Sequence, residues 1–189
     1  MDSRTPPLSF TTDGLLPPGD YELTVAELRE SLLVRGVIEA KNSTWDTAWR
    51  AKLVDNLSIM VGDLHAVGIR EIWINGSFVE QKDHPNDIDG YFPCDLAYLA
   101  SGRLEEDLNK INPRGIWTWD PTSRRPHRGY PKLQLPMWHA YRVELYPHVG
   151  QLTGIRDRHG HELEFPSAFR QSRFDGAAKG IVKLIGDAR

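Results

Sequence analysis

A glycine–serine pair in the middle of the chain has the chemistry of a phosphate site. The segment 69–75 has the β-branched and aromatic content of a strand, and Gly76-Ser77 ends it abruptly. A strand that breaks at this pair leaves backbone N–H groups and a hydroxyl free to meet phosphate oxygens. Gly76 and Ser77 are therefore candidate substrate-binding residues.

Two aspartates follow this pair closely enough to act with it. Nine residues separate Ser77 from Asp87, and Asp89 lies two positions further along a strand expected over 87–92. Residues two apart on a strand point to the same face, so the two carboxylates repel each other unless a cation lies between them. Mg²⁺ or Mn²⁺ would relieve that repulsion and bridge to phosphates. The spacing predicts a metal site at Asp87 and Asp89.

Glu144 is the candidate third carboxylate. It lies between a valine and a leucine on a strand expected over 140–146, where a charged group is costly without a partner. One candidate partner is a metal shared with the aspartates, which would make Glu144 both catalytic and metal-binding. The other is an ion pair with Arg142 on the same face. The metal role is favoured, because a third carboxylate would complete a two-metal site.

Charge is unevenly distributed along the chain. The net charge is −3, but residues 1–110 hold 10 Lys or Arg against 19 Asp or Glu, and residues 111–189 hold 13 against 7. An acidic first part facing a basic second part would suit a metal-bound anion, whereas two solvated faces would merely balance each other. The candidate anion-binding residues are Lys82, Arg124, Arg125 and Arg128, then Lys179 and Lys183, and Arg170 and Arg173 on an expected helix. Tyr130 and Trp138 could stack bases.

This constellation resembles the nucleotidyltransferase superfamily that includes DNA polymerase β. The superfamily signature is Gly-Ser, a spacer of about ten residues, an acidic pair separated by one apolar residue, and a later acidic residue. The matching positions are Gly76, Ser77, Asp87, Asp89 and Glu144. The resemblance implies an Mg²⁺-dependent enzyme that uses an NTP substrate. Gly76 and Ser77 would hold the triphosphate, the aspartates would bind metal, and Glu144 would activate an acceptor hydroxyl on RNA, protein or a small molecule.

Three further segments resemble small bacterial and phage nucleotidyltransferase-like proteins. They are the arm 15–19, the block 84–92 and the closing residues 179–182. Some of those proteins are related in fold to toxins of toxin–antitoxin or phage-defence pairs, which would imply a tRNA or protein acceptor and an antitoxin-like partner. Two other interpretations remain open: a catalytically silent nucleotide- or RNA-binding module, and an interaction protein whose acidic pair is vestigial.

Other site types fail at particular residues. An EF-hand would require glutamate where Leu96 stands, and a nucleophile elbow would require glycine where Val79 stands. The sequence has no P-loop motif. His159-Gly160-His161 predicts a turn between strands rather than a metal site. Cys94 is interpreted as a small core residue.

The elements around these residues predict an α+β fold, a nucleotidyltransferase-like mixed sheet flanked by helices. The 189 residues are 40% apolar and 26% charged, which suits one domain over 1–189 with an extended arm at 1–22. A capping box at Thr24 begins a short helix, and longer helices are expected from Ser43 or Thr44 to Gly68 and over 96–111. A further strand is expected over 115–119 and an exposed loop over 120–136, and 162–165 and 180–185 are further apolar runs. The lone cysteine and the lack of a long apolar run lead us to expect a cytoplasmic protein without a membrane span.

Overall fold

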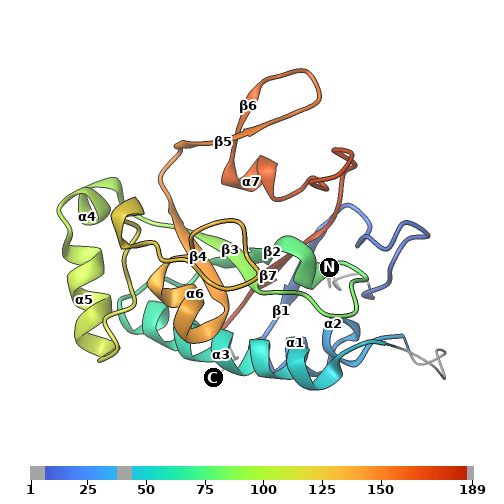
Figure 1. Cartoon of the computed structure of the whole chain (residues 1–189), viewed down its shortest axis with the longest axis horizontal. Coiled ribbons are helices and arrows are strands. Elements are labelled where there is room, and N and C mark those ends of the chain that lie inside the picture. Colours follow the sequence, from blue (N-terminus) through green and yellow to red (C-terminus); the bar gives the residue numbers. More distant parts are fainter. Residues whose placement is uncertain (1–6, 38–43, 187–189) are drawn as a thin grey trace, which may run out of the picture.

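The computed structural model describes residues 7–37 and 44–186, and it confirms an α+β architecture built on a mixed sheet flanked by helices. Five strands pair in the order β1-β7-β2-β3-β4, and β5 and β6 form a separate hairpin (Figure 1). The strands are β1 (Asp20–Leu23), β2 (Ile72–Asn75), β3 (Ile88–Pro93), β4 (Val143–His148), β5 (Leu152–Arg156), β6 (Glu162–Glu164) and β7 (Ile181–Leu184).

Helices cover the sheet unevenly. They are α1 (Val25–Glu30), α2 (Leu32–Arg35), α3 (Thr47–Ala66), α4 (Leu96–Ala100), α5 (Arg103–Ile111), α6 (Pro136–Tyr141) and α7 (Phe165–Ala168), with 3₁₀ turns η1 (Gly76–Val79) and η2 (Pro121–Ser123). Figure 1 shows α1, α2 and α3 on one side of the five-stranded sheet and α7 with the β5–β6 hairpin on the other. Among the described residues, no helix is both long and apolar enough to cross a bilayer.

Side chains alternate along β3, so one face of the sheet packs against the main core. The other face, which carries Asp89 and Tyr91, is called the chemical face. Ile88 and Phe92 are fully buried in the main core with α3. Tyr91 points to the opposite face, where it packs with Trp73 and the α7 region. Because side chains alternate along a strand, Asp89 shares the face of Tyr91. The sheet therefore turns its acidic residues away from the large helical core.

The N-terminal part of the described chain is packed rather than free. Leu16 is fully buried in the main core, and β1 pairs in parallel with β7. The capping box is confirmed, because Thr24 and Glu27 exchange both of its hydrogen bonds. The long helix begins later than expected: Asp46 is its N-cap and accepts from the Trp49 N–H at 2.9 Å. Ser43 lies outside the described residues.

Three sequence-based element assignments are wrong. The helix expected over 96–111 breaks at Gly102, whose φ of +78° favours glycine over residues with a Cβ atom. The segment 115–119 is not a strand, because the side chain of Asn109 takes the hydrogen bonds of the Trp117 backbone at 2.9 and 2.7 Å. Finally, 140–141 belong to α6, so β4 begins only at Val143.

Candidate functional site

Asp89 and Glu144 lie directly beside one another on the chemical face. The strands β3 and β4 are parallel, and their register pairs these two residues. Asp87 comes just before β3 and, two positions from Asp89, is directed to the same face. The side chains of Asp89 and Glu144 are 15% and 7% exposed. The fold thus gathers the three acidic residues that the sequence singled out.

The electrostatics of Asp89 follow from this crowding. Burial, and then the neighbouring negative charges of Asp87 and Glu144, raise the pKa of Asp89 to about 7, while Arg173 opposes the shift. The Nη2 atom of Arg173 lies 3.3 Å from Asp89 Oδ2. Arg173 and, to a smaller extent, Lys179 therefore compensate the negative charge around Asp89 only in part.

Glu144 has protein partners of its own. Its Oε1 accepts the Leu135 N–H at 3.1 Å and lies 3.5 Å from Arg124 Nη1. The hydroxyl of Tyr146, two positions along β4, donates to Oε2. The alternative ion pair with Arg142 is not formed, because Arg142 ends α6 in a left-handed conformation, φ 56°, and stacks over Trp138 at 3.8 Å. The basic partner of Glu144 is Arg124.

Asp87 is held by an indole. Trp138 is fully buried on α6, and its Nε1–H donates to Asp87 Oδ2 at 2.7 Å. The sequence makes Trp138 a candidate for base stacking, but its burial leaves no free ring face for a ligand. Its structural contribution is to fix one oxygen of Asp87.

The Gly-Ser turn packs directly on the acidic residues. As expected, Gly76 ends β2 and begins η1. Its φ is +73°, and a Cβ atom there would lie 2.6 Å from Asp89 Oδ2, closer than atoms pack without displacement. The position therefore requires glycine for both its backbone and its space. Ser77 follows in the turn and is half-buried.

Basic residues of the second part of the chain do meet acidic residues of the first. Lys179, only 3% exposed, pairs with Glu80 and lies 3.4 Å from the Gly76 carbonyl oxygen. Burial lowers the pKa of Lys179 despite the opposing charge of Glu80. Further ion pairs of this kind are Arg173–Asp89, Arg170–Asp20 and Lys183–Glu22.

Arg50 supports the turn from beneath, a role that sequence reasoning missed. It is fully buried on α3, and its guanidinium donates to the carbonyls of Leu33, Phe78, Glu80 and Lys82 at 2.5–3.1 Å. Its guanidinium also stacks on Trp45 at 3.7 Å. Three of the four carbonyls belong to the segment that follows Gly76. The only sequence signal is an arginine among the apolar positions of the helix.

The remaining candidates are exposed side chains, or they differ from what the sequence predicts. Lys82, Arg125 and Arg128 have exposed side chains. Arg170 and Arg173 are not helical, because α7 ends at Ala168. Cys94 is half-buried against the core, and burial raises the pKa of its thiol. The predicted turn at 159–161 is confirmed between β5 and β6.

The fit of a divalent metal rests on donor chemistry. Among the described residues, no group of three His, Cys, Asp or Glu side chains is arranged to hold a metal alone. Mg²⁺ usually binds one or two carboxylates and takes its other ligands from water and substrate phosphates. Asp87 and Asp89 suit that mode. Glu144 suits it less, because both of its oxygens already have donors.

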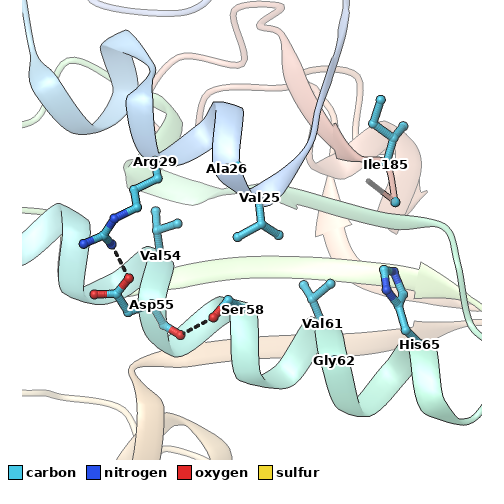
Figure 2. A pocket seen from close by; sticks show the side chains of 11 residues that line it. Val25, Ala26, Arg29, Val54, Asp55, Ser58, Val61, Gly62, His65 and Ile185 are labelled. Atoms are coloured by element: carbon cyan, nitrogen blue, oxygen red, sulfur yellow. Dashed lines mark hydrogen bonds and ion pairs between the residues drawn. The ribbon is translucent and has the colours of Figure 1, made fainter. Parts of the chain in front are cut away.

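A surface pocket lies elsewhere. A depression of about 450 Å³ is lined by residues of α1 and α3, including Val25, Val61 and His65, and by Ile185 just after β7 (Figure 2). The Arg29–Asp55 ion pair borders it. Because α1 and α3 cover the face of the sheet opposite α7, this pocket is separate from the carboxylates.

Comparison with known proteins places the chain in a family. A family model described as a family of unknown function matches residues 8–185. The chain belongs to DUF6932. No curated protein and no solved structure matches it. The DUF6932 match spans every residue of the site, from Gly76 to Lys179, so the carboxylates and the turn lie within the region that defines the family.

Proposed function

We propose that this DUF6932 protein is a metal-dependent nucleotidyltransferase, which transfers a nucleoside monophosphate from an NTP to a hydroxyl. The observation that carries the proposal is the pairing of Asp89 with Glu144, with the Gly76 turn packed against Asp89. Nucleotidyl transfer requires carboxylates that hold cations beside groups that bind phosphates. Here both kinds of group lie at the same end of β2 and β3.

Each residue then has a role. Asp87 and Asp89 would hold Mg²⁺ or Mn²⁺, which when bound neutralises phosphate charge and favours an ionised hydroxyl. Gly76 and Ser77 would bind the β- and γ-phosphates through backbone N–H groups and the serine hydroxyl. Lys179, which pairs with Glu80, lies 3.4 Å from the Gly76 carbonyl oxygen and would hold this turn in position.

Glu144 would accept the proton of the acceptor hydroxyl. The acceptor oxygen then forms its bond to the α-phosphorus, and the bond from that phosphorus to the bridging oxygen breaks to release pyrophosphate. Tyr146 and the Leu135 N–H hold the Glu144 carboxylate in place. The motif resemblance alone extends the proposal to a tRNA or protein acceptor, an antitoxin-like partner and a cytoplasmic setting.

A second candidate is a catalytically silent nucleotide-binding module. It is favoured because the Glu144 carboxylate already has protein partners: its Oε1 lies 3.5 Å from Arg124 Nη1 and accepts the Leu135 N–H at 3.1 Å. A carboxylate with this many donors is a weaker proton acceptor.

Calorimetry with a non-hydrolysable NTP analogue, with and without Mg²⁺, separates the candidates. Binding that requires Mg²⁺ and is lost in Asp89→Asn supports the enzyme. Binding whose affinity changes neither with Mg²⁺ nor with this substitution supports the silent module. No binding with or without Mg²⁺ contradicts both proposed functions.

A further inference from the structure

A loop beside the carboxylates is strongly basic. From residue 121 to residue 143 the chain contains five Lys or Arg and two His but no Asp or Glu. Within this stretch, residues 125–134 form what we call the basic hairpin, closed by paired backbone hydrogen bonds between Arg125 and Gln134 at 2.9 and 2.8 Å. Its basic residues are Arg125, Arg128 and Lys132, and all three side chains are exposed.

In the part of the chain that the structure describes, these three side chains form no ion pair with a carboxylate. Within residues 7–37 and 44–186, the ion pairs of the protein do not include Arg125, Arg128 or Lys132. In a chain with a net charge of −3, an uncompensated basic loop produces a local positive potential. Such a potential attracts polyanions and speeds their encounter with the surface.

The basic hairpin is attached to the candidate site at both ends. At its start, Arg124 contacts Glu144 and the Tyr146 hydroxyl at 3.5 and 3.1 Å. After its end, Trp138 of α6 donates to Asp87. Figure 1 shows this loop, in gold, beside β3 and β4. A molecule bound along the hairpin would therefore lie next to the carboxylates.

The hairpin is also internally ordered. Tyr130 packs edge-on against Trp138 with ring centroids 4.7 Å apart, and His127 contacts the Arg142 guanidinium at 3.0 Å. Both Tyr130 and His127 are half-buried, so each presents part of its surface to solvent. A loop that is already ordered loses less entropy when it binds.

We infer that the basic hairpin binds the acceptor strand, and that this acceptor is single-stranded RNA. Arg125, Arg128 and Lys132 contact successive phosphates, and His127 and Tyr130 offer stacking surfaces to bases. Interleaved cations and aromatic rings are the recurring chemistry of single-strand binding. An isolated triphosphate would instead need cations that converge on one point. That the bound strand is an acceptor rests on the proposed function, whereas the binding itself does not.

The test measures the salt dependence of binding to a fluorescein-labelled, mixed-sequence 12-nucleotide RNA by anisotropy, with the full chain. Three phosphate contacts predict a slope of log K against log salt of about −2, since each contact on a single strand contributes roughly −0.7. The variant Arg125→Gln/Arg128→Gln/Lys132→Gln should bind about tenfold or more weakly at low salt, with a slope near zero. These exposed substitutions leave the core intact.

A matched control removes the same charge elsewhere. Lys52, Arg70 and Arg103 are exposed and lie outside the basic hairpin, so Lys52→Gln/Arg70→Gln/Arg103→Gln should bind RNA like wild type. Equal losses in both triple variants, or no RNA binding at low salt, would overturn the inference. Competition by an acidic peptide as strong as that by unlabelled RNA would assign the hairpin to a protein ligand and overturn it too.

The variant Asp87→Asn distinguishes the two proposals. RNA binding that Asp87→Asn retains, with no transfer by the wild-type protein, would support the RNA site and contradict the nucleotidyltransferase. Transfer to protein that the triple hairpin substitution does not change would sustain the enzyme and overturn the RNA inference.

Discussion

Asp89 and Glu144 occupy paired positions on the parallel strands β3 and β4, facing away from the main helical core. Two acidic side chains in this register repel each other, and Asp87 adds a third negative charge to the same face. The protein tolerates the arrangement with Arg173 and Arg124 nearby. Stability alone would favour apolar residues at these positions, so the acidic cluster points to function.

Removing the charge of Asp89 should stabilise the protein above neutral pH. An aspartate whose pKa is about 7 when folded and near 4 when unfolded binds its proton more tightly in the folded state. Its contribution therefore lowers stability as pH rises from about 4 to about 7, and then levels off. Thermal unfolding of Asp89→Asn should show a higher Tm than wild type at pH 8, with the difference shrinking towards pH 4.

Asp175→Asn is the matched control for this pH series. The backbone N–H of Ala177 lowers the pKa of Asp175, so this substitution should give no stabilisation at pH 8. A loss of stability in Asp89→Asn that is largest at pH 8 would mean that the Asp89 carboxylate is compensated in the folded protein.

The Gly76 turn should not accept a Cβ atom. Gly76→Ala combines a left-handed backbone, which costs about 1–2 kcal/mol, with a contact to Asp89 Oδ2 at 2.6 Å. Gly115→Ala isolates the first effect, because Gly115 has φ +59° and no atom within 4 Å of the place that an alanine methyl group would take. Urea unfolding should show the larger loss for Gly76→Ala, and only this variant should lose binding of the NTP analogue. Equal behaviour of the two variants would remove the turn from the site.

Arg50 should be a major source of stability for the segment after Gly76. Arg50→Met removes a donor from four carbonyl oxygens, of which the Glu80 oxygen still accepts the Lys82 N–H at 2.8 Å. The loss should cost about 3 kcal/mol or more in the free energy of unfolding. Arg29→Met breaks an exposed ion pair with Asp55 and should cost about 1 kcal/mol or less. Similar urea midpoints for the two variants would contradict the role of Arg50.

The indole of Trp138 should matter for activity as well as for stability. Trp138→Phe keeps an aromatic ring but removes the N–H that donates to Asp87 Oδ2 at 2.7 Å. Trp117→Phe removes an equivalent bond to Asp63 Oδ2 at 2.9 Å. Each should lower stability by about 1 kcal/mol, while only Trp138→Phe should weaken Mg²⁺-dependent binding of the NTP analogue. Equal binding by both would assign Trp138 a packing role alone.

The grouping of the candidate site residues is easier to predict from the sequence than the bounds of the elements around them. Gly76, Asp87 and Asp89 are close in sequence, and the two-residue period of a strand is enough to place both aspartates on one face. Glu144 stands out because a carboxylate between apolar residues is conspicuous. Its partner does not stand out, because Arg124 lies twenty positions earlier, in a loop whose path no periodicity encodes.

The errors in secondary structure have tertiary causes. The segment 115–119 has strand-like residues, but the Asn109 side chain takes the hydrogen bonds of Trp117 that a neighbouring strand would make. The residues just before Val143 have the composition of a strand, but residues 140–141 are the last of α6. This helix places Trp138 within hydrogen-bond distance of Asp87. Local propensity cannot indicate which distant group will form the hydrogen bonds of a backbone segment.

The most direct test is transfer of label from α-labelled NTPs to total RNA and total protein, with Mg²⁺ or Mn²⁺. We predict label in the RNA fraction with wild type and with Asp55→Asn, whose substitution lies beside the separate pocket. Asp89→Asn should reduce that label about 100-fold or more. Undiminished label with Asp89→Asn, or no label from any NTP with the folded wild-type protein, would contradict the nucleotidyltransferase.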